Sequence, residues 1–283
     1  SMGSKSLPPG PASAPCLSTK SAIGAPPSEP GGNCEAAKRN RTFRMKQLMA
    51  ALSKSQIDRL GDRLKKGSPS EADLRLLDEY RHSFDAAYDV VIRTIREKLH
   101  LEPTGRTAKS ISSIAEKLRR ESIRLSQVQD IAGCRVIVAD VFTQDQTIAA
   151  LRESFLETRV MDRRTNPSHG YRAVHIIVAT HGVSVEIQVR TALQDLWAQL
   201  SERLADVVDS SIKYGGGTLE DRRWLALISE NIAGWEELEN QLVSSPNQAF
   251  HDVVANEKKR LVQIIHNHIS ALERNALERN RKR

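Results

Sequence analysis

Hydrophobic positions between residues 43 and 125 follow a helical period. A short helix is expected over about 43–65, and "SPSE" at 68–71 predicts a new helix start, with Ser68 in a capping box and Pro69 at the first helical position. Apolar residues then recur at steps of three and four up to Leu99, which predicts one long amphipathic helix. "LEPTGR" at 101–106 ends that helix, and a second one is predicted over about 109–125.

From residue 131 the pattern changes to short apolar runs, which are typical of strands. A strand is predicted over 131–139, a helix over about 144–155 and another strand near 158–163. Two further strands flank a turn at His181-Gly182. Helix resumes at "WAQLSERLADVV", "YGGG" at 214–217 forms a flexible turn, and the remainder to 283 is helical with a basic end. The expected fold class is α/β, a mixed sheet flanked by helices, with helical extensions at both ends.

The two strands around His181-Gly182 have a predictable register. A two-residue turn pairs Thr180 with Val183. The same ladder pairs Ile177 with Glu186, His175 with Gln188, and Ala173 with Arg190. Because side chains alternate at period two, the polar residues of both strands share one face, and the intervening Val and Ile share the other, which must be core. The polar set is His175, Glu186, Gln188 and Arg190.

This polar face has two interpretations. It is either an ordinary solvent-facing sheet surface or the floor of a cleft that binds phosphate and metal. Asp130, at the edge of the preceding strand, would form with Glu186 a carboxylate pair able to hold Mg²⁺, and the ion would bridge phosphate oxygens. Nearby cations would neutralise the remaining charge, as phosphoryl transfer requires. The candidates are Lys109, Lys117, Arg135 and Arg190.

A row of polar residues on the second helix also has two interpretations. Lys109, Ser113 and Lys117 stand at i, i+4 and i+8. They form either a solvated face, in which Glu121 pairs with Lys117, or a row that grips phosphate.

Composition divides the chain into four parts. Residues 1–40 are rich in Pro, Gly, Ser and Ala and are expected to be disordered. A helical region is expected over 41–100, the α/β core over 101–213, and a helical, basic extension over 214–283. A basic cluster lies at residues 38–46, and it is either a solvated tail or a contact for RNA.

The bulk properties exclude some classes of protein. No apolar run approaches the 18 residues of a membrane span, so no membrane role is expected. The three cysteines lack metal-binding spacing, which indicates a reduced, cytoplasmic protein, and Cys134 in an apolar strand is expected to be a small buried hydrophobe. A net charge of +7 favours anionic partners, either nucleotides or nucleic acid.

Four motifs follow one another between about Arg106 and Ala205: "KSISSIAEK", "DIAGCR", "GYRAVH", and "VEIQVRT" followed by "DLW". In this order they resemble the synthetase domain of RelA/SpoT-type alarmone enzymes, particularly the small alarmone synthetases. The resemblance implies a nucleotidyltransferase-like sheet. It also implies transfer of the β,γ-diphosphate of ATP to the ribose 3′-hydroxyl of GTP or GDP, which makes (p)ppGpp and releases AMP.

The resemblance also implies residue roles. Asp130 and Glu186 would be catalytic and bind Mg²⁺, with Glu186 activating the attacking hydroxyl. Tyr171 would stack on the acceptor base. The ATP-binding residues would be Arg106, Lys109, Ser113, Lys117, Arg135 and Arg163. Besides Tyr171, the acceptor-binding residues would be His175, Gln188 and Arg190.

Three departures from the family pattern leave the acceptor open. Thr107 stands where the family has Arg, with Arg106 one step earlier. The acceptor loop "NPSHGY" has no Lys and has His169 in place of Asn, so that Arg163 or Arg164 would have to compensate. Ser201-Glu202 replaces a Glu-His pair. The alternatives are a toxin-type relative, with an antitoxin partner, that modifies the 3′ end of tRNA or makes (p)ppApp, and a catalytically silent nucleotide-sensing protein. The helical C-terminal region would either pair subunits in a homo-oligomer or cover the sheet.

Overall fold

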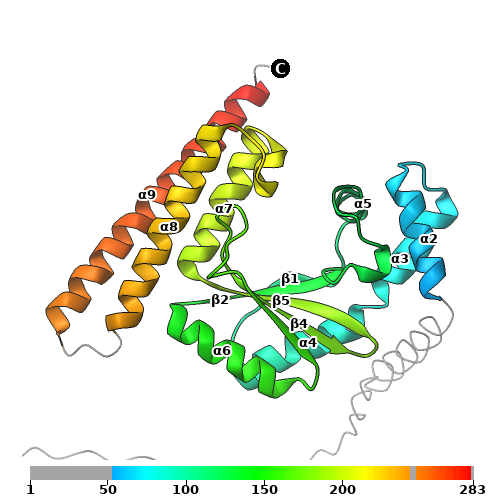
Figure 1. Cartoon of the computed structure of the whole chain (residues 1–283), viewed down its shortest axis with the longest axis horizontal. Coiled ribbons are helices and arrows are strands. Elements are labelled where there is room, and N and C mark those ends of the chain that lie inside the picture. The colour runs from blue at the N-terminus through cyan, green and yellow to red at the C-terminus, as the bar shows by residue number, and fades with distance from the viewer. Residues whose placement is uncertain (1–52, 243–246, 282–283) are drawn as a thin grey trace, which may run out of the picture. The chain divides into compact units, whose positions relative to one another are not determined.

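The computed structural model of the protein describes residues 53–242 and 247–281 (Figure 1). The predicted disordered tail, the basic cluster at 38–46 and the first part of the helix predicted over 43–65 lie outside these residues. The described part of that helix is α2, Lys54–Lys65, which begins at a capping box formed by Ser53 and Gln56.

A five-stranded mixed sheet forms the centre, in the order β1-β2-β5-β4-β3. Only the β2–β5 pair is parallel among its ladders. The strands are β1 (Thr104–Arg106), β2 (Ala132–Val138), β3 (Thr158–Asp162), β4 (Val174–Thr180) and β5 (Val183–Thr191). The predicted α/β class with a mixed sheet is confirmed. The sequence analysis missed β1 because its three residues are all exposed and carry no apolar signal.

The predicted hairpin register is confirmed in three of its four pairs. Thr180 faces Val183, Ile177 faces Glu186 and His175 faces Gln188. The fourth predicted pair, Ala173 with Arg190, lies beyond the ladder, because β4 begins at Val174. The turn residues His181 and Gly182 have φ values of 52° and 77°, and this left-handed geometry matches the twist of the flanking strands.

The predicted long helix up to Leu99 is in fact two helices, α3 (Glu71–His82) and α4 (Asp85–Leu99). The Ser83 hydroxyl donates to the Tyr80 carbonyl (2.6 Å), a local hydrogen bond at the point where the helix is interrupted. The predicted N-cap at Ser68 is also wrong, because the capping box lies two residues later in the chain. Ser70 caps α3 and pairs with Asp73 at the third helical position.

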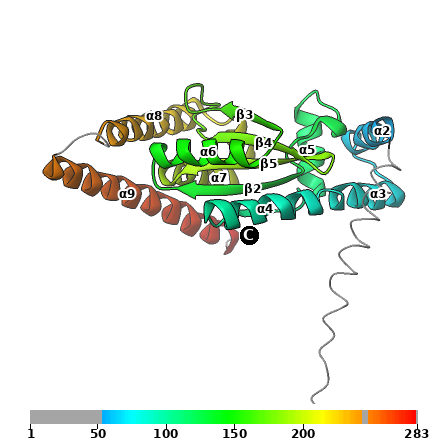
Figure 2. The same ribbon diagram turned by 90° about the horizontal axis from the view of Figure 1, so that it is seen from below.

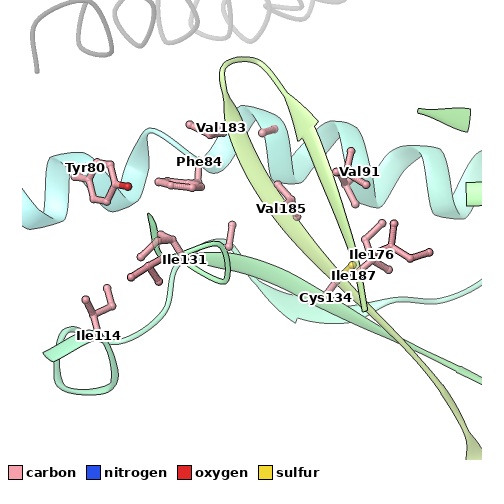
Figure 3. Packing of buried hydrophobic residues seen from close by; sticks show 14 of the residues in the cluster. Tyr80, Phe84, Val91, Ile114, Ile131, Cys134, Ile176, Val183, Val185 and Ile187 are labelled. Atoms are coloured by element: carbon pink, nitrogen blue, oxygen red, sulfur yellow. The ribbon is translucent and has the colours of Figure 1, made fainter. Parts of the chain in front are cut away.

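Helices cover both faces of the sheet. In Figures 1 and 2, α4 and α6 (Val141–Ser154) lie against one face, and α7 (Ala192–Val207) lies on the other, with α5 (Ile111–Arg120) on the same side as α7. Figure 3 shows Phe84, the N-cap of α4, and Val91 of α4 beside the β4–β5 hairpin. The core face predicted for that hairpin is confirmed, since its Val and Ile side chains are fully buried: Val174, Ile176, Val178, Val185, Ile187 and Val189. Cys134 is buried and free, as expected, and burial raises the pKa of its thiol to about 12.

A second buried cluster joins α7 to the C-terminal helices α8 (Leu219–Leu242) and α9 (Gln248–Arg281). The short 3₁₀ helix η2 (Ser210–Tyr214) connects α7 to α8, and η1 (Leu125–Gln127) precedes β2. None of the helices in the described ranges is both long and apolar enough to cross a membrane.

Candidate active site

A polar cavity of about 520 Å³ opens on the sheet face that carries the polar residues of β5. Its walls come from β1, β2, β5, the residues before α5, and α7. The residues that line it are Thr104, Gly105, Arg106, Lys109, Asp130, Gly133, Cys134, Arg135, Glu186, Gln188, Arg190 and Glu202. Three of the four polar residues predicted to share a face of the hairpin, Glu186, Gln188 and Arg190, therefore line a cavity, whereas His175 does not.

Asp130 lies at the edge of this cavity between two lysines. Lys109 Nζ donates to its Oδ2 (2.7 Å) and Lys117 Nζ to its Oδ1 (3.0 Å). Burial raises the pKa of Asp130, but the attraction and hydrogen bonds of the two ammonium groups outweigh burial, so the net pKa lies below the usual range. Asp130 is therefore an anion at neutral pH.

The lysine row differs from the prediction in one respect. Ser110 caps α5, so the helix begins at Ile111 and ends at Arg120, and Lys109 precedes it instead of lying on its face. The Lys109 backbone amide donates to the Ile131 carbonyl (2.6 Å), which ties this segment to the start of β2. Lys117 reaches the same carboxylate from the third turn of α5. Its alternative partner, Glu121, is 4.0 Å away.

Five side chains, three of which line the cavity, form a closed ring of hydrogen bonds, and each of them is held by two of the others. Glu186 Oε1 bonds to His175 Nδ1 (2.8 Å), and His175 Nε2 bonds to the Tyr171 hydroxyl (3.0 Å). Arg190 Nη2 donates both to that hydroxyl (3.1 Å) and to Gln188 Oε1 (2.9 Å). Gln188 Nε2 closes the ring by donating to Glu186 Oε2 (3.0 Å). His175 Nδ1 carries a proton and donates it to Glu186, because an ionised carboxylate only accepts hydrogen bonds.

The charges of Glu186 and Tyr171 follow from this ring. Burial raises the pKa of Glu186, but its hydrogen bonds from His175 and Gln188 and the attraction of His175 outweigh burial and leave the pKa lowered. Burial raises the pKa of Tyr171, only partly offset by Arg190. The cavity therefore presents an ionised carboxylate at Glu186, while the phenol of Tyr171, which does not line the cavity, is neutral.

Asp195, in the first turn of α7, is a functional candidate that the sequence analysis did not assign. Its Oδ1 accepts from Arg190 Nη1 (2.9 Å) and lies 3.1 Å from Arg135 Nη1. The Asp195 side chain is only 5% exposed. Asp195 thereby orients both guanidinium groups. The Nε atoms of Arg135 and Arg190 are buried and have no hydrogen-bond partner among the described residues. The only signal in the sequence was an acidic residue within "DLW".

The donor set fits a hard divalent cation. Asp130 and Glu186 are ionised, line one cavity, and are close enough that Asp130 acts to raise the pKa of Glu186. The described residues contain no group of three or more His, Cys, Asp or Glu side chains placed to hold a metal. Two carboxylates together with phosphate oxygens from a substrate are how proteins usually hold Mg²⁺. These two residues could therefore hold the ion jointly with a phosphate ligand.

Other predicted residues are distributed unevenly. Arg106 lines the cavity, as does Gln188. Ser113 lies in the first turn of α5, beside the N-cap Ser110 (2.7 Å between hydroxyls), and does not line the cavity. Arg163 follows β3, at the opposite edge of the sheet from β1, so the structure does not bring it to the lysines. Its neighbour Arg164 is paired with Asp145 and Asp162.

Comparisons with known proteins find similarity in the part of the chain that carries this cavity. A family model described as a region found in RelA/SpoT proteins matches residues 105–205, the span of the four motifs. An uncharacterized protein of Mycobacterium tuberculosis is 42% identical over 112 residues, 38% of this chain and 41% of that protein. The GTP pyrophosphokinase YjbM of Bacillus subtilis is 33% identical over 133 residues, 41% of this chain and 59% of that one.

Among solved structures, the small alarmone synthetase 1 of Bacillus subtilis bound to its product pppGpp aligns with 63% of this chain and 100% of that chain. The identity is 27% and the TM-score 0.47. The chain spans less than half of the length of the mycobacterial relative and somewhat more than half of YjbM.

Proposed function

Because residues 105–205 match a family model described as a region found in RelA/SpoT proteins, we propose that the protein is a pyrophosphokinase that transfers the β,γ-diphosphate of ATP to the ribose 3′-hydroxyl of GTP or GDP. The observation that carries the proposal is the pair of ionised carboxylates, Asp130 and Glu186, in a cavity otherwise rich in Lys and Arg. In this reaction a bond forms between the acceptor 3′-oxygen and the β-phosphorus of ATP. The bond from that phosphorus to the oxygen that bridges it to the α-phosphorus breaks, and AMP leaves with this oxygen.

The cations in the cavity and beside it suit the triphosphate of ATP. Lys109 and Lys117 meet at Asp130, Arg135 extends from β2 and Arg106 from β1, and all four bear charge opposite to that of the phosphates. Fixed cations stabilise a phosphoryl group in transit mainly by position and electrostatics, so little covalent chemistry is required of the chain. Mg²⁺, held by Asp130 and Glu186, would supply further charge neutralisation on the phosphates.

Glu186 is the proposed general base. Its carboxylate is ionised, and His175 and Gln188 each hold one of its oxygens. It would take the proton of the 3′-hydroxyl as the new bond to phosphorus forms. The hydrogen-bonded ring would keep the carboxylate aimed at the cavity during that transfer.

Tyr171 is the proposed platform for the acceptor base, and two variants separate its ring from its hydroxyl. Tyr171→Ala removes both and is expected to raise the acceptor KM about 5- to 100-fold, the range for loss of one base-stacking contact, with little change in the ATP KM. Tyr171→Phe keeps the ring and loses only the bonds to His175 and Arg190, so a smaller increase is expected. Steady-state kinetics with each substrate varied in turn measures both. Equal losses for ATP and acceptor in Tyr171→Ala would contradict the stacking role.

The proposed function is tested by incubating the full chain with γ-labelled ATP and Mg²⁺ and offering GTP, GDP, ATP or bulk tRNA in separate reactions. Label moving to GTP or GDP together with AMP release supports the proposal. Release of labelled phosphate alone, or no transfer to any acceptor, contradicts it.

A second candidate keeps the donor chemistry and changes the acceptor. The acceptor loop lacks the family's Lys, and residue 169 is a His with φ 54° whose ring packs on Gly215. A toxin-type enzyme that modifies the tRNA 3′ end, or that makes (p)ppApp, would not need a Lys placed for the 5′-phosphates of GTP. Label in the tRNA or ATP reaction would favour this alternative.

A further inference from the structure

Helix α8, in the C-terminal extension, contacts the acceptor loop (residues 167–172) through Ser229. This serine is only 3% exposed. Its hydroxyl donates to the Gly170 carbonyl (2.6 Å) and accepts from Arg172 Nε (3.1 Å). The two residues it holds are those on either side of Tyr171, so a single side chain restrains the backbone around the proposed base platform.

The loop and α8 also approach closely at Gly170, which has φ 88°. A Cβ there would lie 2.8 Å from Trp197 Cζ2 and 3.4 Å from both the Leu225 carbonyl oxygen and Ser229 Cβ. Trp197 Nε1 in turn donates to the Leu225 carbonyl (2.9 Å). The loop backbone is therefore enclosed between α7 and α8, at a position where only glycine fits.

Arg172 links this contact to a second loop. Besides Ser229, its guanidinium donates through Nη1 to the carbonyl of Arg164. The acceptor loop is thereby joined both to α8 and to the segment that follows β3.

Helix α8 is itself anchored at the end of β5. The buried Glu236 accepts hydrogen bonds from the Thr191 hydroxyl and from Gln194 Nε2 (3.0 Å). Thr191 directly follows Arg190, a member of the hydrogen-bonded ring. One helix outside the matched region thus contacts both the loop that carries Tyr171 and the strand that carries Glu186 and Arg190.

We propose that Ser229 is a positioning residue that holds the acceptor loop in a binding-competent shape before the acceptor arrives. The inference rests on the proposed function, since it takes Tyr171 as the acceptor platform. A loop ordered in advance does not lose conformational entropy when the ligand binds, so affinity for the acceptor is retained. Without the serine, Gly170 and Arg172 each lose a buried hydrogen bond, and the cost appears at acceptor binding and not at ATP binding.

The test compares Ser229→Ala with Asn231→Ala in the full chain. Asn231 is a matched control, because it is on the same helix, is exposed, and its side chain bonds, among the described residues, only to the Leu227 carbonyl of α8. Ser229→Ala removes both hydrogen bonds of the serine and is expected to raise the acceptor KM roughly 5- to 30-fold, with the ATP KM unchanged. An acceptor KM equal to that of Asn231→Ala would overturn the inference, as would an equal rise in both KM values.

Arg172→Lys provides a second variant that leaves α8 intact. It keeps the positive charge but cannot reproduce the two guanidinium bonds to Ser229 and Arg164. The expected result is the same selective rise in acceptor KM, and a rise limited to the ATP KM would contradict the proposal.

Hydrogen exchange separates this inference from the proposed function. In nucleotide-free protein, Ser229→Ala is expected to speed amide exchange across residues 167–172 while α9 exchanges as in the wild type. Unchanged exchange in the loop overturns the positioning role. If the wild type transfers label to no acceptor, the proposed function fails, whereas the exchange result still decides whether Ser229 orders the loop.

Discussion

Replacing Glu186 with glutamine is expected to lower the rate of diphosphate transfer about 10³-fold while the fold stays intact. Glutamine has nearly the same shape and its amide oxygen can still accept from His175, so one of the two bonds that hold residue 186 is kept and the bond from Gln188 is lost. It cannot take the proton of the acceptor hydroxyl, and it brings no charge to a metal ion, so the loss falls on the chemical step. AMP release under saturating substrates measures the rate, and circular dichroism checks the fold.

Glu116→Gln is the matched control for this experiment. Glu116 is exposed on α5 and pairs only loosely with Arg120, at 3.7 Å. The control removes the same carboxylate charge outside the cavity and is expected to retain most of the activity. Wild-type turnover in Glu186→Gln would refute the assignment of the base.

The second large effect concerns stability. Asp195→Asn is expected to lower the free energy of unfolding by about 3 kcal/mol, because removal of one member of a buried ion pair leaves an uncompensated charge. Two guanidinium groups depend on this carboxylate, and the Arg190 side chain is as buried as Asp195, each 5% exposed. The carboxylate also stands in the first turn of α7, where the helix dipole favours a negative charge.

Urea unfolding at pH 7 measures the effect of Asp195→Asn. Asp206→Asn serves as the comparison, because Asp206 is exposed and lies 3.8 Å from Lys213, and such a surface pair is worth about 1 kcal/mol or less. If both variants unfold at the same urea concentration, Asp195 does not anchor the arginines in the way the distances indicate.

The β4–β5 hairpin shows how far local pattern reaches. A His-Gly turn of two residues sets the register, and period-two alternation then assigns every side chain to a face. Both consequences hold in the structure, where the apolar face is fully buried and the polar side chains of β5 line the cavity. Residues 174–191 alone assigned the two faces, whereas the choice between a solvent-facing surface and a cavity floor depended on residues outside them.

The N-terminal helices show where the same reasoning fails. The apolar period continues past Ser83, so the sequence predicts one helix, whereas the chain interrupts it there and begins again at Asp85. The spacing of apolar residues shows which face of a helix is buried. It does not detect a short break in the helix that leaves the same face buried. The predicted start of α5 was wrong for a related reason. Ser110 and Ser113 both suit an N-cap region, and only the observed cap at Ser110 excludes Lys109 from the helix.

By itself, the sequence determined the α/β class, the hairpin register, the core face, and the motifs that mark Asp130, Glu186 and the lysines. These depend on short-range periodicity and on residue types that phosphate chemistry demands. The tertiary structure alone decided that Asp195 holds two arginines, that five side chains close a ring, and that Ser229 reaches the acceptor loop from 59 residues away. Hydrogen-bond partners so distant in the chain are selected by how α7 and α8 pack, and no local pattern encodes that choice.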